Sequence, residues 1–161
     1  MRLIPYLVYL LLIACHQVIL KDLTDIFGVG LSLTAFLVMA VAISKSELIS
    51  MWFGFVAGLV MLAGYPDLMG GSAVITAMLG LAAFHACERL NLESLYSKLL
   101  LVLAGVVLHN ALILLLMNWS EFFHLLIVSA LPSAIYTTVL AWIYFLVLEG
   151  RLTFRKLRSV F

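Results

Sequence analysis

The sequence predicts an all-α integral membrane protein in which six transmembrane helices form a single domain over residues 1–161. Hydrophobic residues make up 66% of the chain and charged residues 11%, and the mean hydropathy is +1.24. A soluble domain has about 25% charged residues, so this chain has too few polar side chains to cover a surface that faces water. Its apolar runs lack the alternation of a β-barrel. Runs in hydrocarbon must therefore be helical, because each backbone group needs a partner within its own segment.

Short polar breaks divide the chain into six apolar runs, most of them close to the roughly 20 residues that one crossing requires. The runs are 3–20, 26–43, 48–64, 72–87, 95–117 and 122–148. The first run is similar to a signal peptide, but the polar pair His16-Gln17 interrupts it and no small-residue cleavage site follows. We therefore expect it to remain as the first helix.

Proline residues mark two further features of the chain. Tyr65-Pro66-Asp67 follows the third run, and its Pro and Asp favour a turn. The last run is longer than one crossing needs and contains Pro132, which removes a backbone donor and bends a helix. We expect a short interfacial or kinked segment over 122–130, followed by a helix over 131–148.

The positive charges predict the orientation. With six spans and the N-terminus inside, only Lys21 of the nine Lys and Arg residues lies outside, which leaves eight inside. This bias follows the positive-inside rule, so both termini are predicted to be cytoplasmic. The tail contributes four of these charges, and we expect them to anchor on anionic lipid, with a specific partner contact as the alternative. These residues are Arg151, Arg155, Lys156 and Arg158. The net charge of +1 argues against a nucleic-acid partner.

Polar residues inside a span usually face the bundle interior or a cavity. His16 and Gln17 lie near the outer end of the first helix, and His109 and Asn110 lie in the outer half of the fifth. These four residues are the candidates for an outer cavity. They either form hydrogen bonds between helices or line a pocket for a small molecule.

No chemistry beyond binding is predicted. No two of the four histidines have the i, i+3 or i, i+4 spacing that places two metal ligands on one helix face. No carboxylate lies deep in a span, and no nucleophile is paired with a base. His85 and Glu88 are three residues apart at a helix end, where an ion pair explains them. We therefore expect no metal, no cofactor and no enzymatic activity.

Gly54 and Gly58 form a small-xxx-small pattern in the third helix, which lets two helix backbones approach closely in lipid. The close neighbour is either another helix of the same chain, a second copy in a homodimer, or a partner. Pro132 is a further candidate for helix packing or partner contact.

Four stretches carry a family resemblance. The first two are Leu10-Leu11-Leu12 running to Gln17 and the short Phe27-Gly28-Val29-Gly30 entry to the second helix, and the other two segments are more telling. Gly54-Phe55-Val56-Ala57-Gly58-Leu59 is similar to a GF-x-x-G-L segment, and Leu131-Pro132-Ser133-Ala134-Ile135-Tyr136 is similar to an LP-[ST]-A-x-Y segment, in the rod shape-determining protein MreD family. The layout of apolar runs and a basic tail matches that family along nearly the whole chain. The chain departs from it at Leu62, where family members usually have Asp, and at Gly30-Leu31, where a Pro is common.

The resemblance implies a non-enzymatic scaffold of the bacterial elongation machinery in the cytoplasmic (inner) membrane. Such a scaffold binds the single-span protein MreC and links MreB filaments to the RodA glycosyltransferase and a class B penicillin-binding transpeptidase, so that cell shape is maintained. On this hypothesis, Leu at Gly54 or Gly58 would block assembly with a partner and leave membrane insertion intact.

The family is also similar to the substrate-binding S-components of energy-coupling-factor transporters. The resemblance therefore implies an S-component-like bundle, and it supplies an alternative function. In that alternative, the outer cavity near His16, Gln17, His109 and Asn110 captures a small molecule from outside.

Overall fold

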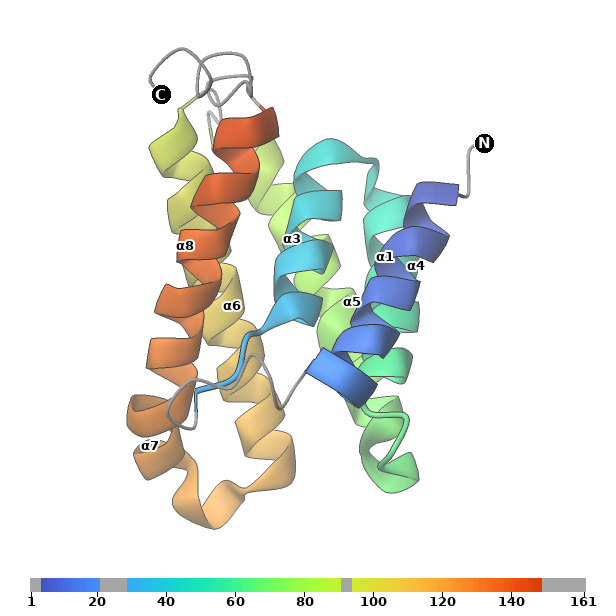
Figure 1. Ribbon diagram of the computed structural model, residues 1–161, viewed down its shortest axis with the longest axis vertical. Coiled ribbons are helices and arrows are strands. Elements are labelled where there is room, and N and C mark those ends of the chain that lie inside the picture. The colour runs from blue at the N-terminus through green and yellow to red at the C-terminus, as the bar shows by residue number, and fades with distance from the viewer. Residues whose placement is uncertain (1–3, 21–28, 91–93, 149–161) are drawn as a thin grey trace.

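The computed structural model describes residues 4–20, 29–90 and 94–148, and 90% of these residues are helical with no strand among them. Six helical segments run up and down in a bundle (Figure 1). The first is α1 (Ile4–Cys15), which continues as the π-helical turn η1 (His16–Leu20). The middle four are α3 (Leu33–Ser44), α4 (Glu47–Met61), α5 (Pro66–Arg89) and α6 (Leu95–Met117).

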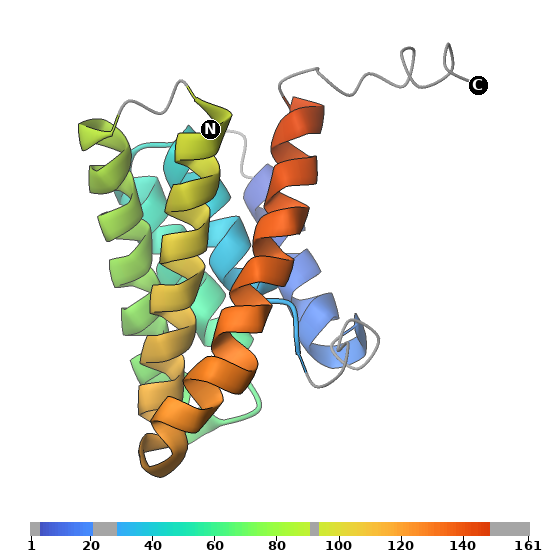
Figure 2. The ribbon, with the colours of Figure 1, turned by 90° about the vertical axis from the view of Figure 1, so that its left-hand side faces the viewer.

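The last segment is helical throughout but changes its winding. It consists of η2 (Trp119–Glu121), α7 (Phe122–Leu125), the π-helical turn η3 (Leu126–Ala130) and α8 (Leu131–Leu148). The part before α8 leans away from the α8 axis (Figure 2). Pro132 is the second residue of α8, next to the π-helical turn, and both features are known causes of a bend. The expected kinked segment therefore lies where the sequence predicts it.

Within the part of the chain that the structure describes, three helical segments are long and apolar enough to cross a membrane: Pro66–Arg89, Leu95–Met117 and Trp119–Leu148. The apolar helices Pro5–Ile19, Leu33–Ser44 and Glu47–Met61 are shorter. At 1.5 Å per residue, the 12 residues of α3 extend about 18 Å, which is less than the hydrocarbon thickness of about 30 Å. The sequence therefore predicts the number of helices correctly but overestimates the length of some.

α3 is the central helix. Every residue from Thr34 to Ala42 is buried, because α1, α4, α5, α6 and α8 all contact this helix. Its predicted start near residue 26 was wrong for the described part of the run, since Gly30 to Ser32 are not helical and α3 begins at Leu33. The Ser32 backbone N–H instead donates to Thr137 Oγ1 of α8 at 3.1 Å. Residues 26–28 lie outside the described residues.

α4 and α5 form the tightest helix pair. A Cβ at Gly54 would lie 2.5 Å from the Thr76 carbonyl oxygen, and one at Gly58 would lie 2.6 Å from the Ala73 Cα. From the α5 side, a Cβ at Gly80 would lie 2.5 Å from the Ser50 carbonyl oxygen. We call this contact the glycine seam. It lets the two backbones touch along the length of the pair.

The boundaries of α5 differ from the sequence prediction. The sequence favours a turn at Tyr65-Pro66-Asp67 and a helix over 72–87, but Pro66 is already the first residue of α5. Pro suits the first helical position because its missing N–H would have no partner inside the helix there. The predictions of 95–117 for α6 and 131–148 for α8 are confirmed.

Candidate functional site

A cavity of about 370 Å³ lies near the end of the bundle where α6 terminates. Its wall comes from η1, the residues that lead into α3, the turn between α4 and α5, the second half of α6, and the junction of η3 with α8. Polar side chains contribute much of this wall: His16, Gln17, Ser32, Thr34, Tyr65, His109, Asn110, Ser129 and Ser133. None of the described lining residues is charged.

The structure brings together the four polar residues that the sequence singles out for an outer cavity. His16, Gln17, His109 and Asn110 all contribute to this one wall. The two histidines are buried, with exposed fractions of 4% for His16 and 1% for His109. His16 begins the π-helical turn η1, which follows the regular winding of α1. The two pairs share one wall because η1 follows the end of α1, while His109 and Asn110 lie in the second half of α6.

Asn110 is the centre of a hydrogen-bond network in this wall. Its Oδ1 accepts from the Ser32 hydroxyl at 2.8 Å, and its Nδ2 donates to the Ala130 carbonyl oxygen at 3.4 Å and to Ser133 Oγ at 3.3 Å. The Ser133 hydroxyl donates in turn to the Gly30 carbonyl oxygen at 2.7 Å. One amide therefore ties α6 to the start of α3 and to the start of α8.

His109 presents a hydrogen-bond acceptor that no described group uses. Its Nδ1 lies 3.5 Å from Asn110 Oδ1, and an amide oxygen can only accept, so this weak contact favours a proton on Nδ1. The Nε2 of the neutral ring is then an acceptor. Within the described part of the chain, this buried atom has no hydrogen-bond partner.

Ser32 and Ser133 are site residues that the sequence reasoning missed. Both are short side chains that any helix or loop tolerates, and their role depends on contacts with residues about 80 to 100 positions away. The only local signal is that Ser133 belongs to the Leu131–Tyr136 segment, which carries part of the family resemblance.

The other predicted site residues lie elsewhere. Gly54 and Gly58 are buried in the glycine seam, where α5 covers them. Pro132 is half-buried at the start of α8, next to the cavity residue Ser133. The glycines are therefore occupied by packing within the chain, and a partner would need a different surface. The basic residues of the tail, Arg151, Arg155, Lys156 and Arg158, lie outside the described residues.

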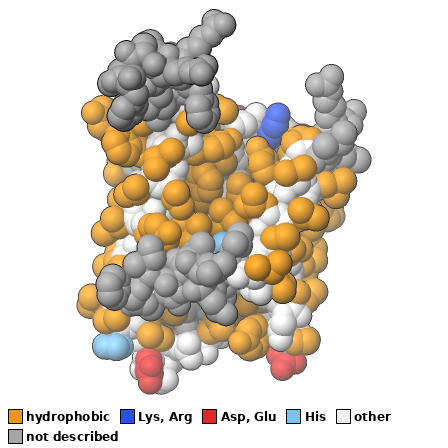
Figure 3. All heavy atoms as spheres, in the orientation of Figure 1, with side chains coloured by type: hydrophobic (Ala, Val, Ile, Leu, Met, Phe, Trp, Pro, Cys, Tyr) orange, Lys and Arg blue, Asp and Glu red, His pale blue; other side chains and the backbone are white. Residues whose placement is uncertain are grey.

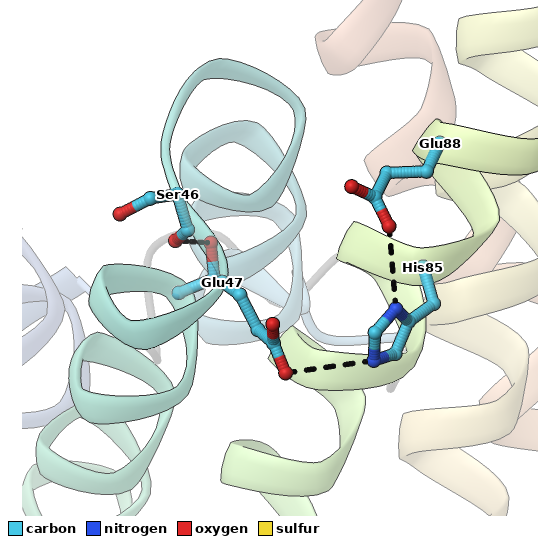
Figure 4. Close-up of polar contacts among 5 residues, drawn as sticks. Ser46, Glu47, His85 and Glu88 are labelled. Atoms are coloured by element: carbon cyan, nitrogen blue, oxygen red, sulfur yellow. Dashed lines mark hydrogen bonds and ion pairs between the residues drawn. The ribbon is translucent and has the colours of Figure 1, made fainter.

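A second polar cluster joins the start of α4 to the end of α5 (Figure 4). His85 of α5 lies between two carboxylates, with Nε2 3.6 Å from Glu47 Oε1 of α4 and Nδ1 3.5 Å from Glu88 Oε2. The side chains of His85 and Glu47 are 52% and 54% exposed. The expected pairing of His85 with Glu88 is thus present, and Glu47 joins it from the neighbouring helix.

Because these groups are half exposed, water screens their attraction. We expect His85→Ala to change the free energy of unfolding by less than about 1 kcal/mol, as is typical of exposed ion pairs. Thermal unfolding of the variant in detergent measures this change. A loss of about 3 kcal/mol in the free energy of unfolding, as expected from overpacking a buried position, would contradict the assignment to a surface ion pair.

The arrangement of the cavity is suited to binding by hydrogen bonds. Among the described residues, no group of three or more His, Cys, Asp or Glu side chains is placed to hold a metal ion. The described cavity wall also has no carboxylate that could act as a base beside a hydroxyl. Comparison of the chain with protein-family models, with curated proteins and with solved structures finds no match.

Proposed function

We propose that this chain is a non-enzymatic membrane scaffold of the MreD type, embedded in a bacterial inner membrane as a six-helix, S-component-like bundle with both termini in the cytoplasm. The observation that carries the proposal is the position of two of the segments that resemble the family. Gly54–Leu59 supplies half of the glycine seam, and Leu131–Tyr136 begins α8 and contributes Ser133 to the network around Asn110. The resembling residues therefore hold the bundle together, as expected when a family shares a fold and not a reaction.

The distribution of side chains supports a lipid environment. Large apolar side chains face outward, such as Leu11 at 66% exposed and Ile135 at 62%, while Thr76, Thr137 and His109 are buried. Apolar side chains cover most of the face in Figure 3. A protein in water would pay a large cost for such a surface, since soluble monomers rarely expose apolar patches beyond a few hundred Å².

The described charges support the proposed orientation. Lys45, Arg89 and Lys98 all lie at the end of the bundle that holds the first turn of α1 and the last turn of α8. Glu47 and Glu88 share that end, but acidic residues contribute little to the rule, and none of the described Lys or Arg residues lies at the opposite end, where Asp67 and Glu121 are found. In the view of Figure 3, acidic side chains lie along the lower edge and a basic one at the upper edge. By the positive-inside rule, the end with the first turn of α1 and the last turn of α8 is cytoplasmic.

The orientation can be tested with two exposed serines at opposite ends of α6. In a background of Cys15→Ala and Cys87→Ala, we expect Ser120→Cys to react with a membrane-impermeant maleimide added outside spheroplasts, because residue 120 follows α6 at its outer end. Ser94→Cys, just before α6, should react only after lysis. The reverse pattern would contradict the proposed topology.

Partner contact is expected through the outward faces of the helices, because the glycine seam is already filled. We expect the chain to co-purify with MreC of the same bacterium when the two are co-expressed. The matched control is MreC whose single span is replaced by an unrelated span of equal length, which should lose co-purification. Equal recovery of both forms would contradict helix-to-helix contact, and recovery of neither would contradict MreC as the partner.

The cavity favours one alternative, a substrate-binding S-component. In that case the chain would co-purify with coupling and ATPase subunits in place of MreC and peptidoglycan synthases. MreB, RodA and the class B transpeptidase belong to the first proposal only, and their recovery together with MreC would separate the two functions.

A further inference from the structure

We infer that the cavity is a binding site for a small uncharged molecule that offers at least one O–H or N–H donor to His109 Nε2. The inference does not depend on the scaffold proposal, because it concerns the inside of the bundle and needs no protein partner.

The first argument is the unused acceptor. His109 is 1% exposed, and its Nε2 has no hydrogen-bond partner among the described residues. A buried polar atom without a partner costs about 1 to 3 kcal/mol, and native proteins leave few of them. A donor inside the adjoining cavity would remove this cost.

The second argument is the composition of the wall. Its described residues include no Asp, Glu, Lys or Arg, and burying an unpaired charge is costly, so the ligand is neutral. Apolar residues, such as Leu31, Ile113 and Leu114, also line the cavity. A ligand that combines a hydroxyl or amide group with apolar surface would match both parts.

The third argument is that the wall is ordered before any ligand arrives. Hydrogen bonds to Ser32, Ser133 and the Ala130 carbonyl group hold the Asn110 side chain in place. Asn110 therefore cannot easily turn to donate a hydrogen bond to His109 Nε2. The cavity of about 370 Å³ is within the usual range for small-molecule sites, which is about 300 to 1,000 Å³. The exposed Tyr65 and Met117 belong to its wall and give it an edge at the outer end of the bundle.

The same hydroxyl or amide chemistry can come from a free solute or from the uncharged headgroup of a lipid. Native mass spectrometry of the protein released directly from membrane vesicles distinguishes these sources by the mass of the bound molecule. A solute adds less than about 500 Da, in keeping with the volume of the cavity, whereas a two-chain lipid adds more.

Two variants test the site in different ways. His109→Phe keeps a ring but removes the acceptor, and its control is His124→Phe at an exposed position outside the wall. Gly30→Leu adds bulk at a wall residue where a Cβ meets no atom within 4 Å, so folding should survive. Its control is Gly70→Leu, which also meets open space but is not part of the wall.

We expect the unmodified protein and both control variants to carry the bound mass. Occupancy should fall at least about tenfold in His109→Phe and in Gly30→Leu, as the loss of one good hydrogen bond or of the space itself implies. If the unmodified protein had the mass of its polypeptide alone, the inference would be overturned, because the cavity would then hold only water. A bound mass that both site variants retain would also overturn it, since the molecule would lie elsewhere.

Discussion

Gly58→Leu is expected to prevent stable folding of the α4–α5 pair. A Cβ at this position would already lie 2.6 Å from the Ala73 Cα and 2.6 Å from the Ser72 carbonyl oxygen, both of which belong to the backbone of α5 and cannot move aside. The Ser72 hydroxyl also donates to the Gly58 carbonyl oxygen at 2.7 Å, and separating the helices would break this bond. Overpacking typically costs about 1 to 3 kcal/mol, and a leucine against backbone should reach or exceed the upper end.

The measurement is the midpoint of thermal unfolding in detergent, together with the monodisperse fraction on gel filtration. Gly70→Leu is the matched control, because it lies in the same bundle on α5 and a Cβ there meets nothing within 4 Å. If both variants unfolded at the same temperature as the unmodified protein, the glycine seam would not be the close contact described above. The sequence-based expectation for this position was loss of a partner with insertion intact, whereas the structure predicts loss of the fold itself.

Asn110→Leu is expected to loosen the contact between α6, the start of α3 and the start of α8. The change removes the acceptor of the Ser32 hydroxyl and the donor to the Ala130 carbonyl group. A buried group that loses its last partner costs about 1 to 3 kcal/mol, but the Ser32 hydroxyl keeps Ser133 Oγ at 2.9 Å as a partner. Hydrogen bonds between membrane helices are weaker on average, about 0.6 to 2 kcal/mol each. We therefore expect a loss of about 1 to 3 kcal/mol in total.

Asn118→Leu is the matched control, since Asn118 is exposed at the end of the same helix and its backbone N–H donates to the Leu114 carbonyl oxygen, whereas its side chain forms no hydrogen bond among the described residues. A double-mutant cycle of Asn110→Leu with Ser133→Ala isolates the shared contact at 3.3 Å. The two losses should add to more than the loss in the double variant, because each change removes the same interaction. Strict additivity would contradict a network centred on Asn110.

Composition and apolar runs were enough to predict an all-helical chain with six helices. The limits of α6 and α8 follow from the sequence because polar residues end α6 sharply and Pro132 marks the start of α8. The start of α3 did not follow, since it depends on hydrogen bonds from Ser32 to Thr137 and Asn110, which are far away in the chain. The start of α5 was misjudged because Pro favours both a turn and the first position of a helix.

The residues of the candidate site could likewise be predicted from the sequence only in part. His16, Gln17, His109 and Asn110 could be identified because polar residues within apolar runs are rare and tend to face inward. Whether the glycine pair faced a partner or a neighbouring helix could not be decided from its spacing, which serves both purposes. In the structure Gly54 and Gly58 of α4 pack against the backbone of α5. Polar residues within apolar runs therefore predicted part of the cavity wall, whereas the surface open to a partner depends on which helices pack together.

Purification of the tagged protein from its native membrane in a mild detergent, followed by mass spectrometry of the proteins that accompany it, tests the central claim most directly. The scaffold proposal predicts a single-span protein of the MreC type together with peptidoglycan synthases. Recovery of ATPase and coupling subunits without cell-wall synthases would contradict it and identify the chain as a transporter component.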